Sequence, residues 1–272
     1  MIPHPFLDTS RHLRSGWWIA VFFAILAALL MPLLLTSRAA EAEVPIWKQA
    51  LVVLGASWIC QALRRRPVTE VTGAFDSRWP AEWLLGGALG AALMLVPALL
   101  LGGARLVTWE VSAMGATALM PALGLSLAVA VTEELLFRGF MFQRLVNGLG
   151  KAPAQIVIAA FFVLTHSSAL QGAGALGYLA GVNIFIASLM FGLAFLRTRS
   201  LAMPIGLHFA ANFVQGGVLG FGVSGSDEPG LLLPHLASGA DGLTGGAFGL
   251  EASAPGLLCV MAATVALFRW RR

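Results

Sequence analysis

Residues 112–142 read SAMGATALMPALGLSLAVAVTEELLFRGFMF. The stretch is apolar for long enough to cross a bilayer, which takes a helix of about 20 residues. Near its end it carries two adjacent glutamates, Glu133 and Glu134, and then Arg138. A charged side chain at bilayer depth costs at least about 2.5 kcal/mol, so such residues usually face a protein interior and take part in function. The stretch therefore predicts a membrane helix that carries a functional site.

The composition indicates the same class of protein for the whole chain. Of 272 residues, 58% are hydrophobic and 11% are charged, whereas soluble domains carry about 25% charged residues. The net charge is +4, but the basic residues lie in short loops between apolar runs, which argues against a nucleic-acid partner. The two cysteines, Cys60 and Cys259, lie in apolar stretches and form neither a disulfide framework nor a CxxC metal site.

Apolar runs predict an all-α polytopic membrane protein with about eight transmembrane helices. The first three spans form an N-terminal part, 1–111, and spans four to seven form a catalytic core, 112–221. The remainder, 222–272, is expected to be an irregular external loop followed by the last membrane helix. The predicted spans cover residues 17–36, 45–63, 82–104, 113–136, 154–170, 176–196, 201–221 and 255–268. The fourth span could continue as a helix toward Val146, since only Gly139 would interrupt it.

The basic residues orient these spans. With eight spans, only three of the 17 Lys and Arg residues, Arg38, Lys48 and Arg105, fall on one side of the membrane. The positive-inside rule places the other side, and with it both termini, in the cytoplasm. The chain has 15 Arg and 2 Lys, a bias typical of a GC-rich bacterium, so we expect a multi-pass protein of a bacterial cell membrane. The cytoplasmic group comprises Arg11, Arg14, Arg64, Arg65, Arg66, Arg78, Arg138, Arg144, Lys151, Arg197, Arg199, Arg269, Arg271 and Arg272.

Helical spacing groups the buried polar residues. Glu134 and Arg138 are four residues apart and share a helix face, in the order that favours an ion pair. Glu133 is offset by about 100°, so it is free to exchange a proton if Arg138 keeps Glu134 charged. His208 and Asn212 are also four residues apart and could bind a polarised oxygen, a water or a metal.

Each of these pairs also has a purely structural interpretation. Glu134 and Arg138 could form an interfacial salt bridge, and a single His or Asn in a membrane helix often only bonds a neighbouring helix. With His166 in span five, however, two Glu, an Arg, two His and an Asn lie on three spans. That is more polarity than helix packing requires.

The same residues resemble a known family. Glu133-Glu134-x-x-x-Arg138, Phe162-x-x-x-His166 and His208-x-x-x-Asn212 are similar, in order and spacing, to the three motifs of the CPBP intramembrane proteases. This family is also called the Abi family and includes CAAX proteases and bacteriocin-processing enzymes. The resemblance covers about residues 112–221. It implies an intramembrane endopeptidase that cleaves a membrane protein or a membrane-bound peptide.

The resemblance also implies roles. Glu133 and His166 would activate a water, His208 and Asn212 would stabilise the oxyanion, and Glu134 with Arg138 would be a supporting pair. The set of Glu133, His166 and His208 is acceptable for catalytic zinc, although no H-E-x-x-H motif is present. Zinc-dependent and metal-free mechanisms therefore both stay open.

Depth along the spans places His166 and His208, and Glu133 if span four continues to about Val146, near the bilayer middle or on its cytoplasmic side. We therefore expect water and substrate to reach them from the cytoplasm or laterally from lipid. Gly222-Val-Ser224-Gly225 resembles the G-x-S-G of rhomboid serine proteases, but no later membrane helix supplies the histidine that Ser224 would need.

Two other function classes compete with the protease. A non-catalytic protein on the same scaffold, such as an immunity factor or partner subunit, would tolerate the loss of motif residues, yet all six are present. A secondary transporter would favour internal hydropathy symmetry, which the chain lacks. The sequence indicates neither the substrate nor the oligomeric state.

Overall fold

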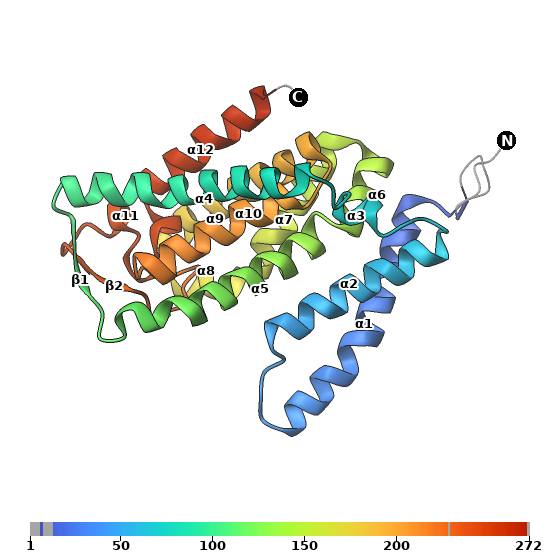
Figure 1. The fold of residues 1–272 in the computed structure, drawn as a ribbon, viewed down its shortest axis with the longest axis horizontal. Coiled ribbons are helices and arrows are strands. Elements are labelled where there is room, and N and C mark those ends of the chain that lie inside the picture. The colour runs from blue at the N-terminus through green and yellow to red at the C-terminus, as the bar shows by residue number, and fades with distance from the viewer. Residues whose placement is uncertain (1–5, 8–12, 228, 271–272) are drawn as a thin grey trace.

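The computed structural model describes residues 6–7, 13–227 and 229–270, and helices dominate it (Figure 1). Three of the basic residues used for orientation, Arg11, Arg271 and Arg272, lie outside the described residues. The long helices are α1 (Ser15–Ala39), α2 (Ile46–Leu63), α4 (Arg78–Gly103), α5 (Leu119–Phe137), α7 (Lys151–Thr165), α9 (Leu176–Thr198), α10 (Ala202–Asn212) and α12 (Ala254–Arg269). The shorter elements are α3 (Thr69–Thr72), β1 (Val107–Val111), η1 (Gly115–Ala118), α6 (Phe140–Leu149), α8 (Ser167–Gly172), the π-helix η2 (Phe213–Val218), β2 (Leu232–Leu236), α11 (Asp241–Thr244), η3 (Gly246–Phe248) and η4 (Leu250–Ala252).

The predicted class, an all-α polytopic membrane protein, is confirmed. In the described part of the chain, five helical stretches are long and apolar enough to cross a membrane, and α7 and α12 are shorter apolar helices. Each of the eight predicted spans has a helical counterpart, with span seven formed by α10 and η2. The number of spans that cross the bilayer stays a prediction, as do the three proposed segments of the chain.

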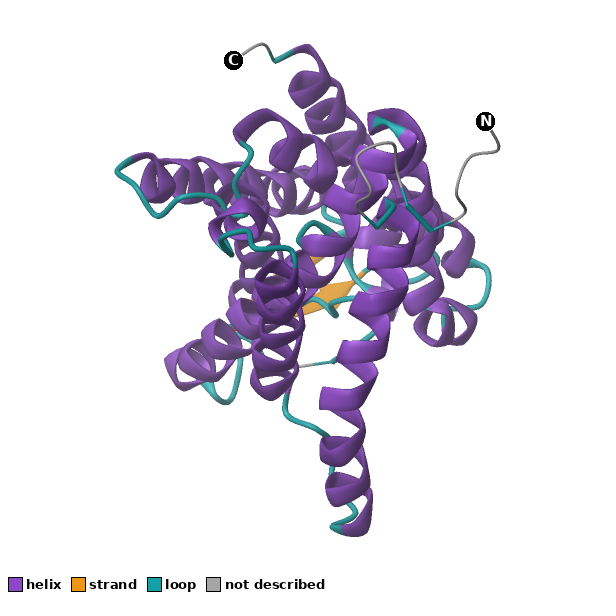
Figure 2. Ribbon diagram, turned by 90° about the vertical axis from the view of Figure 1, so that its right-hand side faces the viewer, coloured by secondary structure: helices purple, strands orange, loops and turns teal. Residues whose placement is uncertain are grey.

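Different elements lie at the two ends of the molecule (Figure 1). The β1–β2 pair lies at one end, and α3, α6 and the start of α1 lie at the other. Helices α1 and α2 stand beside the main bundle, and α1 extends away from it (Figure 2). Among the residues of α1, only Phe22 is buried, as expected for a helix whose other faces meet lipid.

Two helices break at residues that matter for the site. Helix α5 ends at Arg138, and Gly139, with φ −73° and ψ −128°, separates it from α6. A Cβ on Gly139 would lie 2.1 Å from the carbonyl oxygen of Leu135, so only glycine fits this break. Span four therefore does not continue as one helix. Span five, expected over 154–170, is likewise divided into α7 and α8 at His166.

The segment 222–254, which was expected to be irregular, contains short regular elements. It contains β2, which pairs antiparallel with β1 from Val107–Leu236 to Val111–Leu232. The Trp109 indole N–H also donates to the Leu219 carbonyl oxygen at 3.1 Å. These contacts fix the segment against the ends of the membrane helices.

Glycines allow α4 and α10 to pack backbone to backbone. A Cβ at Gly86 or Gly90 would lie 2.1 Å from a carbonyl oxygen of α10, and a Cβ at Gly206 would lie 2.1 Å from the Trp83 carbonyl. Small residues let membrane helices approach closely. This contact fixes α10, which carries His208.

We expect Gly90→Ala to destabilise the protein, because the new methyl must push α4 away from α10. Such overpacking costs about 1–3 kcal/mol. Gly87→Ala is the matched control, since its Cβ would meet nothing closer than 3.8 Å. Thermal unfolding in detergent should show a lower midpoint for Gly90→Ala alone, and equal midpoints for the two variants would contradict the packing described.

Candidate active site

A fully buried ion pair joins the second glutamate to the arginine. Glu134 and Arg138 have fully buried side chains, and Arg138 Nη1 lies 3.2 Å from Glu134 Oε1. Arg138 Nη2 also donates to the Ser188 hydroxyl at 2.7 Å and to the Ser188 carbonyl at 3.0 Å. The guanidinium lies 5.0 Å from the ring centroids of Phe162 and Phe191. Both terminal nitrogens of Arg138 therefore have partners, as a buried charge requires, whereas Arg138 Nε and Glu134 Oε2 have no hydrogen-bond partner.

His208 connects the two glutamates. Its Nδ1 lies 2.9 Å from Glu134 Oε1, and its Nε2 lies 3.8 Å from Glu133 Oε2. The imidazole stacks on Phe191 with an interplanar angle of 14°. A carboxylate of Glu134 can only accept, so Nδ1 carries a hydrogen. The ring is thereby held with Nε2 facing Glu133 and the cavity.

His166 is also held through its Nδ1, in this case by a backbone carbonyl. It lies at the α7–α8 break, and its Nδ1 is 2.8 Å from the Phe162 carbonyl oxygen. Since a carbonyl only accepts, Nδ1 is the donor. In the neutral imidazole, Nε2 is then left with a lone pair that can accept a hydrogen bond.

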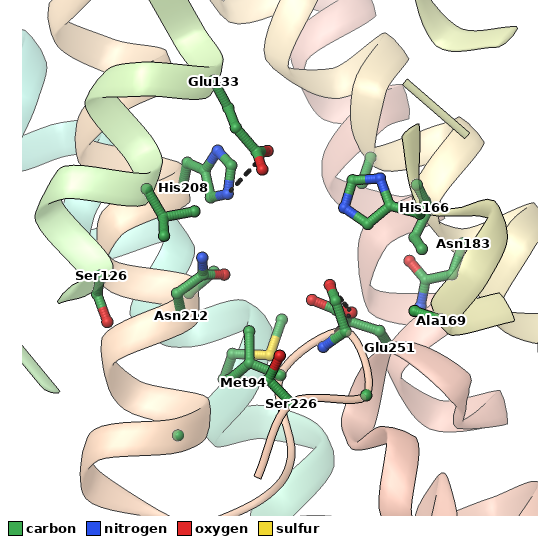
Figure 3. A pocket seen from close by; sticks show the side chains of 18 of the residues that line it. Met94, Ser126, Glu133, His166, Ala169, Asn183, His208, Asn212, Ser226 and Glu251 are labelled. Atoms are coloured by element: carbon green, nitrogen blue, oxygen red, sulfur yellow. Dashed lines mark hydrogen bonds and ion pairs between the residues drawn. The ribbon is translucent and has the colours of Figure 1, made fainter. Parts of the chain in front are cut away.

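A cavity of about 630 Å³ brings these residues together. Figure 3 shows Glu133, His208 and Asn212 on one wall and His166 on the opposite wall. Glu133 keeps about a quarter of its side chain exposed, whereas Glu134 is fully buried. The polar lining residues are Ser126, Glu133, Thr165, His166, Ser168, Asn183, His208, Asn212, Ser224, Ser226 and Glu251.

Residues 115–214 match the family model described as type II CAAX prenyl endopeptidase, Rce1-like. This region is similar to the Rce1-like family. The match contains all six of the motif residues, from Glu133 to Asn212, and agrees with the resemblance to CAAX proteases. Comparisons with curated proteins and with solved structures give no match.

One polar residue of the cavity wall, Glu251, lies outside the residues that match the family model. Glu251, on η4 beyond the matched residues, presents its carboxyl group to the cavity near His166 (Figure 3). The Ser224 N–H and hydroxyl donate to Glu251 Oε2 at 3.1 and 2.7 Å. Burial raises the pKa of Glu251, and the hydrogen bonds from Ser224 oppose that rise. The Ser224 hydroxyl is thus engaged by a carboxyl group, and within the described ranges no hydrogen bond joins it to a histidine.

Sequence reasoning missed Glu251 because nothing near it resembles a motif. The segment that carries it is tied to the helix of His208 through Gln215, whose amide donates to the Gly222 carbonyl at 2.6 Å. A Cβ on Gly249, which has φ +97°, would lie 2.8 Å from that same amide. Such links between distant segments carry no local sequence signal.

The three residues considered for zinc do not form a preassembled metal site. Among the residues that the structure describes, no three His, Cys, Asp or Glu side chains lie close enough together to bind one metal ion. His208 Nδ1 is occupied by Glu134, and His166 lies across the cavity from Glu133.

The cavity extends from Glu133 toward the β1–β2 end of the molecule. Its lining residues on α5 begin at Ala122 and end at Glu133, and on α10 and η2 they run from Leu207 to Gly217. Toward the opposite, basic end, the buried Arg138 packs 5.0 Å from the ring centroids of Phe162 and Phe191. Access was expected from the basic end or laterally from lipid, whereas the lining residues favour access from the β1–β2 end.

Cysteine labelling should show this direction of access. In a background with Cys60→Ala and Cys259→Ala, we expect Ser226→Cys and Asn212→Cys to react with an impermeant thiol reagent applied outside intact bacterial cells. Both residues line the cavity. Asn147→Cys, at the exposed basic end, should react only in inverted vesicles, because the positive-inside rule places that end in the cytoplasm. The reverse pattern would contradict the orientation.

Proposed function

We propose that this protein is an intramembrane endopeptidase in which Glu133 and His166 activate a water molecule. The Rce1-like match supports a CAAX-type endopeptidase in general. The observation that carries the assignment of the base is the unequal environment of the two glutamates. Arg138 and His208 Nδ1 both contact Glu134, while Glu133 faces the cavity.

The proposed reaction begins with a water between Glu133 and His166 Nε2. As the water oxygen bonds to the peptide carbonyl carbon, its proton passes to Glu133 by general base catalysis. The negative charge moves to the carbonyl oxygen, which receives hydrogen bonds from His208 Nε2–H and the Asn212 amide. Such donors contribute roughly 2.7–4 kcal/mol each in other enzymes.

The intermediate then collapses to products. The C–N bond breaks, Glu133 returns its proton to the leaving nitrogen, and a carboxylic acid and an amine result. His208 is suited to stabilise the negatively charged oxygen. Its Nδ1–H donates to Glu134, and its Nε2 faces Glu133. As an imidazolium between these two carboxylates, the ring carries its second hydrogen on Nε2.

The lining of the cavity suggests which peptides bind. Two glutamates, Glu133 and Glu251, line it, and no Lys or Arg is among its described lining residues. We propose a membrane-associated peptide with neutral or basic side chains near the scissile bond, because an acidic side chain would be repelled.

A peptide library tests this function. The purified protein in bilayer discs is mixed with a proteome-derived peptide library, and new termini are identified by mass spectrometry with and without a zinc chelator. We expect new termini that are depleted in Asp and Glu near the cleavage site. Loss of cleavage with chelator, restored by zinc, would support the zinc-dependent mechanism, and no cleavage in either arm would favour the non-catalytic alternative.

A further inference from the structure

A second cavity, of about 940 Å³, lies at the basic end of the molecule. It is formed by the start of α1, the end of α2 and α6, and it shares no lining residue with the cavity around Glu133. No Asp or Glu is among its described lining residues, whereas five are arginines: Arg14, Arg64, Arg65, Arg66 and Arg144.

Few carboxylates balance these charges. Glu70 Oε2 lies 3.7 Å from Arg64 Nη1, and Glu70 Oε1 lies 3.6 Å from Arg66 Nη1. Across the described ranges, no ion pair joins Arg14, Arg65 or Arg144 to an acidic side chain. Among the described residues, Glu70 thus pairs with two of the five arginines, and this excess of positive charge favours an anion in the cavity.

Arg144 provides a second, independent observation. This residue is 8% exposed, and its Nε has no hydrogen-bond partner. The guanidinium lies 5.5 Å from the Phe140 ring centroid, so its position is fixed by packing. A buried charged donor of this kind requires an acceptor, and the cavity is where one can bind.

The first turn of α1 also favours an anion here. Ser15 and Gly16 line the cavity, and no side-chain cap and no acidic residue lies at this helix N-terminus. The unpaired backbone N–H groups of a first helical turn attract phosphate and similar groups. The helix is 25 residues long, so its dipole adds to that attraction.

The surroundings of the cavity suit a lipid. Trp17 is 44% exposed and lies in the first turn of α1, an apolar helix with one buried residue. Exposed tryptophans are typical of the membrane interface. An acyl chain can therefore lie along α1 while its headgroup reaches the arginines. We propose that this cavity binds the phosphate-bearing headgroup of an anionic phospholipid.

Native mass spectrometry of the full chain tests the site. The protein is supplied with phosphatidylglycerol or phosphatidylcholine that carry the same acyl chains. We expect wild-type protein to retain more phosphatidylglycerol, and Arg144→Gln or Arg65→Gln to reduce that retention about fivefold, as for one basic residue at a membrane surface. Arg78→Gln is the control, because Arg78 lies at the same end and does not line the cavity.

Equal retention of the two lipids, or an equal loss in Arg78→Gln, would overturn the proposal. Size-exclusion chromatography checks that each variant is folded. Because Arg65 is exposed, Arg65→Gln should fold even if Arg144→Gln does not. In a further arm, inorganic phosphate at millimolar concentration should leave phosphatidylglycerol bound. Complete displacement would identify a site for soluble phosphate compounds and overturn the lipid assignment.

Discussion

Glu133→Gln is expected to abolish peptide cleavage and to leave the protein folded. The amide keeps the shape of the side chain but cannot take a proton from water, and loss of a general base typically lowers the rate by about 10²–10⁴-fold. Folding should persist because Glu133 is partly exposed and its Oε2 lies 3.8 Å from His208 Nε2, which is longer than a hydrogen bond. Cleavage of a peptide identified in the library, together with thermal unfolding, measures both effects.

Glu133→Asp is a useful companion, because it keeps the charge but retracts the carboxylate. Partial activity in Glu133→Asp and none in Glu133→Gln would indicate that the carboxylate itself is needed. Turnover near the wild-type rate in Glu133→Gln would show that another group activates the water.

Arg138→Ala is expected to destabilise the protein strongly. Removing one partner of a buried ion pair strands the other and costs about 3–5 kcal/mol. Glu134 would lose its counter-charge, and the contacts to Ser188 would also be lost. Thermal unfolding in detergent should show a large fall in the midpoint, whereas Arg78→Ala, at an exposed position, should change it little.

The double variant Glu134→Gln with Arg138→Met separates charge from packing. If the stranded charge causes the loss, the double variant should unfold at a higher temperature than Arg138→Ala. An Arg138→Ala protein as stable as the Arg78→Ala control would show that the buried pair contributes nothing to the fold.

The sequence predicted the helices well because membrane helices are long and uniformly apolar. Span boundaries at α2, α4 and α9 agree to within a few residues. The breaks at Gly139 and His166 were not predicted, since a helix end inside an apolar run depends on contacts with neighbouring helices. The β1–β2 pair was also missed, although Val107–Val111 is rich in β-branched and aromatic residues that favour strands.

For the candidate site, spacing within one helix was sufficient to pair Glu134 with Arg138. It was not sufficient for the contact between Glu134 and His208, whose residues are 74 positions apart. Glu251 was beyond prediction for the same reason, because only tertiary packing brings it to the cavity. The segment that carries Glu251 reaches the cavity through loops, and helical spacing does not predict the path of a loop.

Cleavage in oxygen-18 water most directly tests whether a water activated at Glu133 breaks the peptide bond. The wild-type protein is incubated with a library-identified peptide and hydroxylamine, and the new C-terminus is analysed by mass spectrometry. We expect one solvent oxygen in each new carboxylate, no hydroxamate, and no product from Glu133→Gln. A hydroxamate at the new C-terminus would reveal an acyl-enzyme formed by a side-chain nucleophile, and it would contradict direct attack by water.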